Sequence, residues 1–378
     1  MEIEITPGRL SGRVAAVPSK SMAHRLLICA ALARSPLTIQ GGSGDIQATI
    51  RCLGALDTGL PLDCGESGTT LRFLLPVAAA LGARAEFRLG KRLSHRPLAP
   101  LTRALTGHGV TLSQAGPGLC ISGRLRPGGY RLPGNVSSQF ISGLLLALPL
   151  LDGPSTLQVD GPVESAPYVE MTLAVMGRFG VQVLRQGNGF WIPPGEYRSP
   201  GPVEPEGDWS AAAFWLAANA LGSRVQVTGL TEDSCQGDRI APLLLARLGD
   251  TIGLAQTPDL APPLAAAAAA WPGQTTFTHA ARLRLKESDR IAALEAMVEQ
   301  LGGRAWETAD GLVIRGCRLT GGVVDSAGDH RIAMAAAIAA TACTGPVRIR
   351  GAEAVEKSYP RFWQDYRALG GNWKEWKP

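Results

Sequence analysis

Residues 288–316 read SDRIAALEAMVEQLGGRAWETADGLVIRG, and the fold prediction rests on this stretch. Five apolar side chains recur at helical spacing and predict a helix over 288–301 with one apolar face: Ile291, Leu294, Met297, Val298 and Leu301. Gly302 follows where helices often end in a left-handed residue. Asp310-Gly311 then lies between two strand-like runs and is typical of a hairpin turn. The stretch therefore predicts a helix, a glycine stop and a β-hairpin in succession.

A helical pattern that ends in glycine and is followed by a strand-like run recurs six times along the chain. The glycines are 53–71 residues apart: Gly54, Gly109, Gly180, Gly249, Gly302 and Gly370. We expect each of these glycines to take a left-handed conformation directly after a helix and to be followed in the sequence by a strand. Tandem solenoid repeats are shorter and more regular, so we expect six larger α/β units grouped into two domains. The open alternative is that glycine simply ends many helices.

Length and composition limit the class of protein. A chain of 378 residues suggests two or three domains. Its 45% hydrophobic residues provide for a large core, which excludes intrinsic disorder. The start MEIEITPGRL is acidic, so we expect no signal peptide. The longest stretch without charged side chains, 260–281, holds three prolines and many alanines, so we expect a soluble protein without a membrane helix.

Seven cysteines are scattered and never spaced CxxC: Cys29, Cys52, Cys64, Cys120, Cys235, Cys317 and Cys343. This pattern argues against a disulfide framework and a structural zinc site. We expect buried thiols in a reducing compartment, the cytoplasm. A nucleic-acid-binding module would be a different class of protein. A net charge of +5 is dilute for it, and lysines and arginines do not run together.

Five expected helix N-termini share an unusual composition. Serine or threonine there is an ordinary cap, but the positive end of the helix dipole disfavours lysine and arginine. The cations become favourable when an anion lies in front of the helix, where N–H groups, hydroxyls and guanidinium groups converge on it. The five starts are Pro18-Ser19-Lys20-Ser21, Gly65-Glu66-Ser67-Gly68-Thr69, Val136-Ser137-Ser138-Gln139, Lys286-Glu287-Ser288-Asp289-Arg290 and Asp329-His330-Arg331. Each alone has an ordinary structural explanation, but five in one chain predict a polyanionic small-molecule substrate.

The motifs at these starts, with several others, resemble those of the 5-enolpyruvylshikimate-3-phosphate synthases. In chain order they are PSKSMAHR (18–25), GESGTTLR (65–72), Arg96-Pro97, VSSQF (136–140), SAPY (165–168), QGD (236–238), LRLKESDR (283–290), GDHRIAM (328–334) and EKSYP (356–360). The resemblance spans nearly the whole chain. It implies a two-domain inside-out α/β barrel of six βαβαββ repeats, three in each domain. The first domain would hold residues 1–18 and 207–378 and the second 19–206, with the active site in the cleft between them.

The resemblance also implies a reaction. The family transfers the enolpyruvyl group of phosphoenolpyruvate to the 5-hydroxyl of shikimate 3-phosphate by addition and elimination, in aromatic amino acid biosynthesis. Implied shikimate 3-phosphate contacts are Ser21, Arg25, Ser137, Ser138, Gln139, Ser165, Tyr168, Asp259 and Lys286. Implied phosphoenolpyruvate contacts are Lys20, Gly68, Arg96, Gln139, Arg290, His330, Arg331 and Lys357. The implied catalytic residues are Asp259 near the 5-hydroxyl, Glu287 beside C3 of phosphoenolpyruvate, and Lys20.

Further expectations complete this prediction. We expect no cofactor or metal, no nucleic-acid or membrane partner, a cytoplasmic monomer, and inhibition by glyphosate at the phosphoenolpyruvate site. Neighbouring carboxylates and bound phosphates would raise the pKa of Glu287, whereas Lys286 and Arg290 would lower it, and the sequence leaves the balance open. Two positions depart from the family: Glu66 and Arg282 stand where many members have asparagine. Asp259 lies in a Pro- and Ala-rich stretch, where the correspondence is least secure.

The nearest alternative is the sister family of UDP-N-acetylglucosamine 1-carboxyvinyltransferases. Those enzymes usually carry a cysteine in the loop that corresponds to 91–97, and this chain has none there. The motifs SSQF and KESDR also favour shikimate 3-phosphate as the acceptor.

Overall fold

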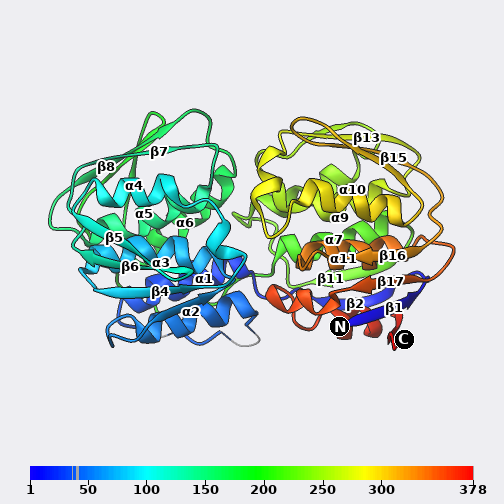
Figure 1. Cartoon of the computed structure of the whole chain (residues 1–378), viewed down its shortest axis with the longest axis horizontal. Helices are drawn as coiled ribbons and strands as arrows, with labels where there is room; N and C mark the ends of the chain where they lie inside the picture. Colours follow the sequence, from blue (N-terminus) through cyan, green and yellow to red (C-terminus); the bar gives the residue numbers. More distant parts are fainter. Residues whose placement is uncertain (36, 40–41, 378) are drawn as a thin grey trace. The chain divides into compact units, whose positions relative to one another are not determined.

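The computed structural model describes residues 1–35, 37–39 and 42–377 (Figure 1). The chain divides into two compact units. Unit 1 comprises Met1–Val17 and Glu206–Pro378, and unit 2 comprises Pro18–Pro205. The division into a domain of residues 1–18 and 207–378 and a domain of residues 19–206 remains a prediction.

One βαβαββ unit contains residues 288–316. Its elements are β12 (Thr251–Gly253), α9 (Ala261–Ala268), β13 (Gly273–Thr278), α10 (Arg290–Gln300), β14 (Arg304–Glu307) and β15 (Leu312–Gly316). Strands β12 and β13 pair in parallel, and β15 pairs antiparallel with both β13 and β14. The sheet order is therefore β12-β13-β15-β14. The predicted helix, glycine stop and hairpin are confirmed here, with the helix beginning two residues later than expected.

Three more units each have a four-stranded sheet with the same strand order. One contains β3 (Leu62–Gly65), α3 (Gly68–Leu81), β4 (Ala85–Leu89), α4 (Ala99–Thr106), β5 (Val110–Ala115) and β6 (Gly118–Gly123). The next contains β7 (Gly129–Pro133), α5 (Ser138–Ala147), β8 (Ser155–Asp160), α6 (Ala166–Arg178), β9 (Leu184–Gln186) and β10 (Gly189–Ile192). The last contains β16 (Gly322–Asp325), α11 (His330–Ala340), β17 (Val347–Arg350), α12 (Phe362–Ala368), β18 (Asn372–Glu375) and β1 (Glu2–Thr6). Strand β1 lies between β17 and β18 in this last sheet, so the two ends of the chain complete one unit together.

The two remaining repeats are reduced. In unit 1, β2 (Ser11–Ala15) pairs in parallel with β11 (Arg224–Thr228), accompanied by α7 (Trp209–Ala220) and α8 (Ala241–Leu245). In unit 2, the described residues of the first repeat form the helices α1 (Lys20–Leu32) and α2 (Gly44–Ala55). Helix α2 leads directly to β3, and helix α8 leads directly to β12. In the described residues no hairpin lies between either helix and the strand that follows it. The described residues also form six short 3-10 helices: η1 (Leu93–His95), η2 (Leu148–Leu150), η3 (Gly237–Ile240), η4 (Pro258–Leu260), η5 (Ala281–Leu285) and η6 (Ala352–Lys357).

Five of the six glycine marks have the expected left-handed conformation. Their φ angles lie between 80° and 100°: Gly109, Gly180, Gly249, Gly302 and Gly370. The expectation at Gly54 is wrong, because Gly54 lies inside α2. The helix continues past Gly54 to Ala55, and the left-handed glycine comes later, at Gly59 with φ 76°.

Buried helices form the interior of each unit, and the sheets lie outside them (Figure 1). In unit 1 every residue of α9 and α11 is buried, and these helices consist largely of alanine. In unit 2 the helices α3 and α5 approach closely at Gly143, where an added Cβ would clash with the carbonyl of Arg72. Pro76 cannot donate the usual helical hydrogen bond to that carbonyl, since proline has no N–H. The buried helices thus carry their N-termini on a rigid interior.

No helix of the described residues is long and apolar enough to cross a membrane. All seven cysteines are present as thiols, and Cys29, Cys52, Cys64 and Cys343 are buried.

Candidate active site

The five unusual sequence segments lie at helix N-termini, as predicted. In each helix a serine or aspartate side chain accepts a hydrogen bond from a backbone N–H of the first turn. The caps are Ser19 for α1, Ser67 for α3, Ser137 for α5, Asp289 for α10 and Asp329 for α11. Because the caps hold these turns in place, the cationic side chains that follow them start from fixed backbone positions.

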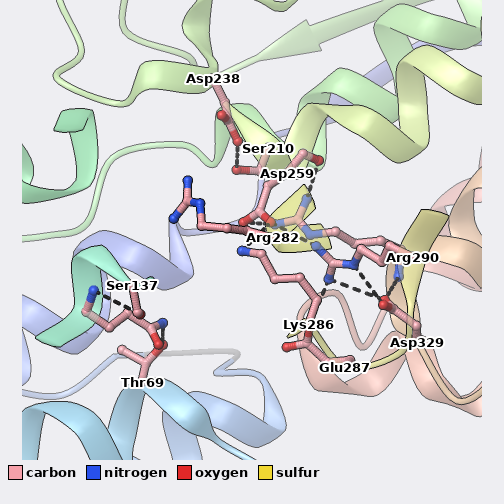
Figure 2. Close-up of polar contacts among 12 residues, drawn as sticks. Thr69, Ser137, Ser210, Asp238, Asp259, Arg282, Lys286, Glu287, Arg290 and Asp329 are labelled. Carbon is pink, nitrogen blue, oxygen red and sulfur yellow. Dashed lines mark hydrogen bonds and ion pairs between the residues drawn. The ribbon is translucent and has the colours of Figure 1, made fainter. Parts of the chain in front are cut away.

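Arg290 is the centre of a charge cluster in unit 1 (Figure 2). Its side chain is 1% exposed. Its Nε donates to Oδ2 of Asp329 at 2.7 Å, and its two terminal nitrogens donate to Asp259 and Glu287, each at 2.9 Å. A buried guanidinium needs such partners, because an uncompensated buried charge is strongly destabilising. Arg290 therefore fixes three carboxylates relative to one another.

Asp259 receives cations from three directions. Besides Arg290, Nη2 of Arg331 lies 3.1 Å from its Oδ2 and Nζ of Lys286 lies 3.4 Å from its Oδ1. Burial alone would raise the pKa of Asp259, but the charges of Arg331, Lys286 and Arg290 outweigh it and hold this pKa well below its usual value. The Asp259 carboxylate is thus ionised at neutral pH.

Lys286 has a perturbed pKa. Burial disfavours its ammonium form and lowers the pKa to about 8, although the neighbouring Asp259 opposes this shift. Arg290 and Arg282 add to the lowering because they are like charges. Lys286 therefore gives up a proton more readily than an ordinary lysine.

Asp329 ties the two cationic helix starts of unit 1 together. It is fully buried, accepts from Arg290 and Ser288, and caps α11 by accepting from the backbone N–H of Arg331. Nδ1 of His330 lies 3.6 Å from its Oδ1. Asp329 stands in the GDHR motif, but no feature of the sequence marked it as a site residue.

Asp238 of the QGD motif lies beside Ser210, above Asp259 in the view of Figure 2. Burial raises the pKa of Asp238 to about 6, and the negative charge of Asp259 adds to the rise. The hydroxyl of Ser210 donates to its carboxylate and limits that shift. Arg282, at the second position that departs from the family, donates to the carbonyl of Ala255 at 3.0 Å.

In unit 2, Lys20 forms an ion pair that the sequence analysis missed. Its Nζ lies 2.8 Å from Oδ2 of Asp45, and the two side chains are 15% and 7% exposed. Asp45 stands at the start of α2, twenty-five residues further along the chain. The local sequence does not single out Asp45, because an acidic residue in the first turn of a helix is ordinary.

Arg25 binds the protein itself at three points. Its guanidinium donates to the carbonyls of Ser21 and Tyr168 and to the hydroxyl of Thr172, over 2.6–2.8 Å. It therefore links α1 to α6, the helix that begins after Ser165. Ser165 is buried and has φ 55°, a left-handed conformation that is strained for a residue other than glycine.

Gln139 is held by two partners. Its Oε1 accepts from Arg72 at 2.7 Å, and its Nε2 donates to the hydroxyl of Thr69 at 2.8 Å. Arg72 also donates to the carbonyl of Pro97 at 3.0 Å. Arg72 belongs to the GESGTTLR motif but was not assigned a role. It orients Gln139 and the backbone next to Arg96 together.

Arg96 lies directly against Gly68. An ideal Cβ on Gly68 would be 2.8 Å from one terminal nitrogen of Arg96 and 3.3 Å from its Cζ. The expected contact residues Gly68, Arg96 and Gln139 are thus brought together within unit 2.

The assigned residues fall into two groups. Unit 1 brings together Asp259, Lys286, Glu287, Arg290, His330 and Arg331, and it also carries Lys357 at the end of η6. Unit 2 carries Lys20, Ser21, Arg25, Gly68, Arg96, Ser137, Ser138, Gln139, Ser165 and Tyr168. In the part of the chain that the structure describes, no group of three or more His, Cys, Asp or Glu side chains is arranged to hold a metal ion. The dominant chemistry is cationic, which suits anionic ligands.

Comparisons with known proteins agree with this chemistry. The chain matches the family model described as EPSP synthase (3-phosphoshikimate 1-carboxyvinyltransferase) over residues 5–60, 49–253 and 246–366. The three segments overlap at 49–60 and 246–253, the two places where α2 and α8 lead into the next unit without a hairpin.

Two full-length relatives are similar in sequence. The 3-phosphoshikimate 1-carboxyvinyltransferase of Clostridium kluyveri is 40% identical over 420 aligned positions, covering 99% of this chain and 98% of the relative. The enzyme of the same name from Clostridium acetobutylicum is 37% identical over 423 positions, with the same coverage.

Solved structures show the fold. An EPSP synthase from Acinetobacter baumannii has a TM-score of 0.80 at 23% identity, covering 99% of this chain and 100% of that chain. The enolpyruvyl transferase NikO from Streptomyces tendae has a TM-score of 0.77 at 20% identity, covering 99% and 98%. The predicted two-domain inside-out α/β barrel is thereby confirmed.

Proposed function

The chain belongs to the EPSP synthase family, and on that basis we propose how its residues share the work of the family reaction. The reaction transfers the enolpyruvyl group of phosphoenolpyruvate to the 5-hydroxyl of shikimate 3-phosphate and releases phosphate. It is a step of the shikimate pathway. UDP-N-acetylglucosamine is not favoured as the acceptor, because the full-length relatives are 3-phosphoshikimate enzymes.

The observation that carries the assignment is the convergence of Arg290, Arg331 and Lys286 on the Asp259 carboxylate. Arg290, Arg331 and Lys357 are the proposed contacts from unit 1 for the carboxylate and phosphate of phosphoenolpyruvate. Lys20, Arg96 and the backbone of Gly68 are the proposed contacts from unit 2. The active site between the two domains remains a prediction.

Asp259 is proposed to orient the 5-hydroxyl and accept its hydrogen bond. With a strongly lowered pKa it is a weak base in the unliganded protein. Bound phosphoenolpyruvate would compete for the same three cations, so their hold on Asp259 would weaken and its pKa would rise. The aspartate would then accept the hydroxyl proton more readily as the oxygen attacks C2.

Glu287 is proposed as the acid and base at C3. It must give a proton to C3 in the addition and remove one in the elimination, when phosphate leaves. Arg290 fixes its carboxylate at 2.9 Å. Lys286 lies next to it in the chain, and a pKa of about 8 makes this lysine able to supply a proton at neutral pH.

Shikimate 3-phosphate is proposed to bind to unit 2. The N–H groups and hydroxyls of Ser137 and Ser138 at the start of α5 suit its phosphate. Gln139, Ser165, Tyr168 and Ser21 are further proposed contacts. Arg25 would act on the ligand and also hold the backbone of Tyr168, to which it donates.

We also propose that the enzyme acts as a cytoplasmic monomer without cofactor or metal. Size-exclusion chromatography with light scattering tests the oligomeric state, and activity after treatment with a chelator tests the metal.

A pair of lysine variants tests the site. We expect Lys20→Ala to lower the phosphate-release rate with both substrates by about 100-fold, because it removes a partly buried cation from a phosphate site. Lys374→Ala is the matched control, since Lys374 is 69% exposed and pairs with Glu4 on the surface. Circular dichroism must report the same fold for both variants. Equal rates for the two variants would contradict the assignment of Lys20.

A further inference from the structure

Two neighbouring loops of unit 2 start from adjacent strand ends. Strand β3 ends at Gly65 and strand β4 at Leu89, and the two strands pair in parallel. The backbone N–H of Gly90 donates to the carbonyl of Gly65 at 2.7 Å, which holds the starts of both loops together. One loop leads to Gly68 and the other to Arg96. Both therefore reach the proposed phosphoenolpyruvate site.

The side chain of Glu66 joins the two loops. Its Oε2 accepts from the backbone N–H of Leu93 at 2.8 Å, and its Oε1 accepts from that of Arg92 at 3.2 Å. These N–H groups open the short helix η1, whose first donors have no acceptor within the helix. Glu66 thus caps η1 from outside, in the way that aspartate and serine cap longer helices.

Arg96 follows directly after helix η1. The N–H of Arg96 donates to the carbonyl of Leu93 at 3.1 Å and closes the turn. The next carbonyl, that of Pro97, accepts from Arg72 at 3.0 Å. Arg96 is therefore held on its N-terminal side by Glu66 and on its C-terminal side by Arg72, and its guanidinium lies against Gly68.

We propose that Glu66 is a positioning residue that sets the affinity for phosphoenolpyruvate through Arg96. The proposal rests on the assignment of Arg96 to phosphoenolpyruvate made above. A carboxylate suits this role because each of its two oxygens accepts one N–H, whereas an amide has one acceptor and would turn an NH2 group toward the second donor. The negative charge of Glu66 faces backbone N–H groups. Many family members have asparagine at this position.

Gly90 supports the same arrangement. An ideal Cβ on Gly90 would clash with Oε1 and Cδ of Glu66. Its backbone is not left-handed, so alanine is disfavoured there by this contact and not by conformation. Gly90 therefore leaves the space that the Glu66 carboxylate occupies.

Glu66→Gln is the first test. We expect the KM for phosphoenolpyruvate to rise about three- to tenfold, the size expected for the loss of one cap. The kcat and the calorimetric Kd for shikimate 3-phosphate should stay unchanged, because neither depends on the position of Arg96 in the free enzyme. Gly90→Ala should reproduce the effect, since its Cβ displaces the carboxylate. Glu86→Gln on β4 is the control, because it removes a carboxylate that pairs with the surface residue Arg88, and it should change nothing.

A double variant separates positioning from general damage. If Glu66 acts through Arg96, Glu66→Gln should add nothing to the KM of an Arg96→Ala enzyme. An equal additional rise in that background would overturn the proposal, as would an unchanged KM for the single variant or a joint loss of kcat and shikimate 3-phosphate binding. If Arg96→Ala itself leaves the KM for phosphoenolpyruvate unchanged, the assignment of Arg96 fails. A raised KM in Arg96→Ala with a silent Glu66→Gln contradicts only the role of Glu66.

Discussion

Replacing Gly68 with alanine should weaken glyphosate more than phosphoenolpyruvate. The added Cβ would lie 2.8 Å from a terminal nitrogen of Arg96 and 3.4 Å from one of Arg72. Ordinary contact between such atoms begins near ~3.5 Å, so the Arg96 guanidinium must retreat by about 0.7 Å. The tip of an arginine can move, so the cost belongs at the lower end of the ~1–3 kcal/mol typical of overpacking.

The added methyl group should weaken the binding of the two ligands to different extents. Phosphoenolpyruvate is the shorter anion, and a displaced Arg96 can still reach it. Glyphosate is longer and needs the space that the methyl group takes. About 1–2 kcal/mol corresponds to a five- to thirtyfold change. We therefore expect the glyphosate Ki to rise about five- to thirtyfold, and the KM for phosphoenolpyruvate to rise by a clearly smaller factor.

Steady-state inhibition at several phosphoenolpyruvate concentrations measures both constants, with shikimate 3-phosphate saturating. Inhibition of the wild type should be competitive with phosphoenolpyruvate. Gly54→Ala is the matched control, because a Cβ on Gly54 in α2 meets no atom within 4 Å. A wild type that resists millimolar glyphosate would refute the role of Gly68. Equal rises of the two constants in Gly68→Ala would refute the steric argument.

Three further predictions concern catalysis, pH and motion. Glu287→Gln should slow turnover and leave the calorimetric Kd for shikimate 3-phosphate unchanged; loss of both would indicate a structural carboxylate. The folded-state pKa of Lys286 is lowered to about 8, so the unfolded chain binds more protons between pH 8 and 10.5, and the stability contributed at this site should rise with pH across that range. The same deprotonation removes a cation, so kcat/KM for phosphoenolpyruvate should fall above pH about 8. If Lys286→Met keeps the wild-type pH profile of kcat/KM, Lys286 is not the group whose deprotonation causes the fall. Saturating shikimate 3-phosphate should lower the radius of gyration in small-angle scattering, and an unchanged curve would count against domain closure.

The helices and hairpins were predictable where local sequence sets them. The apolar spacing of α10, the glycine at 302 and the Asp310-Gly311 turn are local signals, and no distant contact overrides them. Gly54 carries the same local signal, and the prediction there is wrong. Gly302 comes after the last residue of α10, Gln300, whereas Gly54 lies inside α2, which continues to Ala55. The local pattern of leucine and glycine after a helical run does not distinguish the two positions.

The cations of the site were predictable because they occupy helix starts where the dipole disfavours them. Their partners were not. Asp45 and Asp329 bind cations 25 and 39 residues away in the chain, and Arg72 reaches Gln139 across 67 residues. No local spacing marks such pairs, because the fold alone brings them together. By its charge alone Glu66 would repel an anion, whereas in the structure its oxygens face two backbone N–H groups.

The most direct test is phosphate release by the purified wild-type protein. With phosphoenolpyruvate and shikimate 3-phosphate together, we expect steady phosphate release matched by an equal amount of enolpyruvyl product. With UDP-N-acetylglucosamine in place of shikimate 3-phosphate, we expect no release above that of phosphoenolpyruvate alone. Release with the nucleotide sugar, or none with shikimate 3-phosphate, would contradict shikimate 3-phosphate as the acceptor.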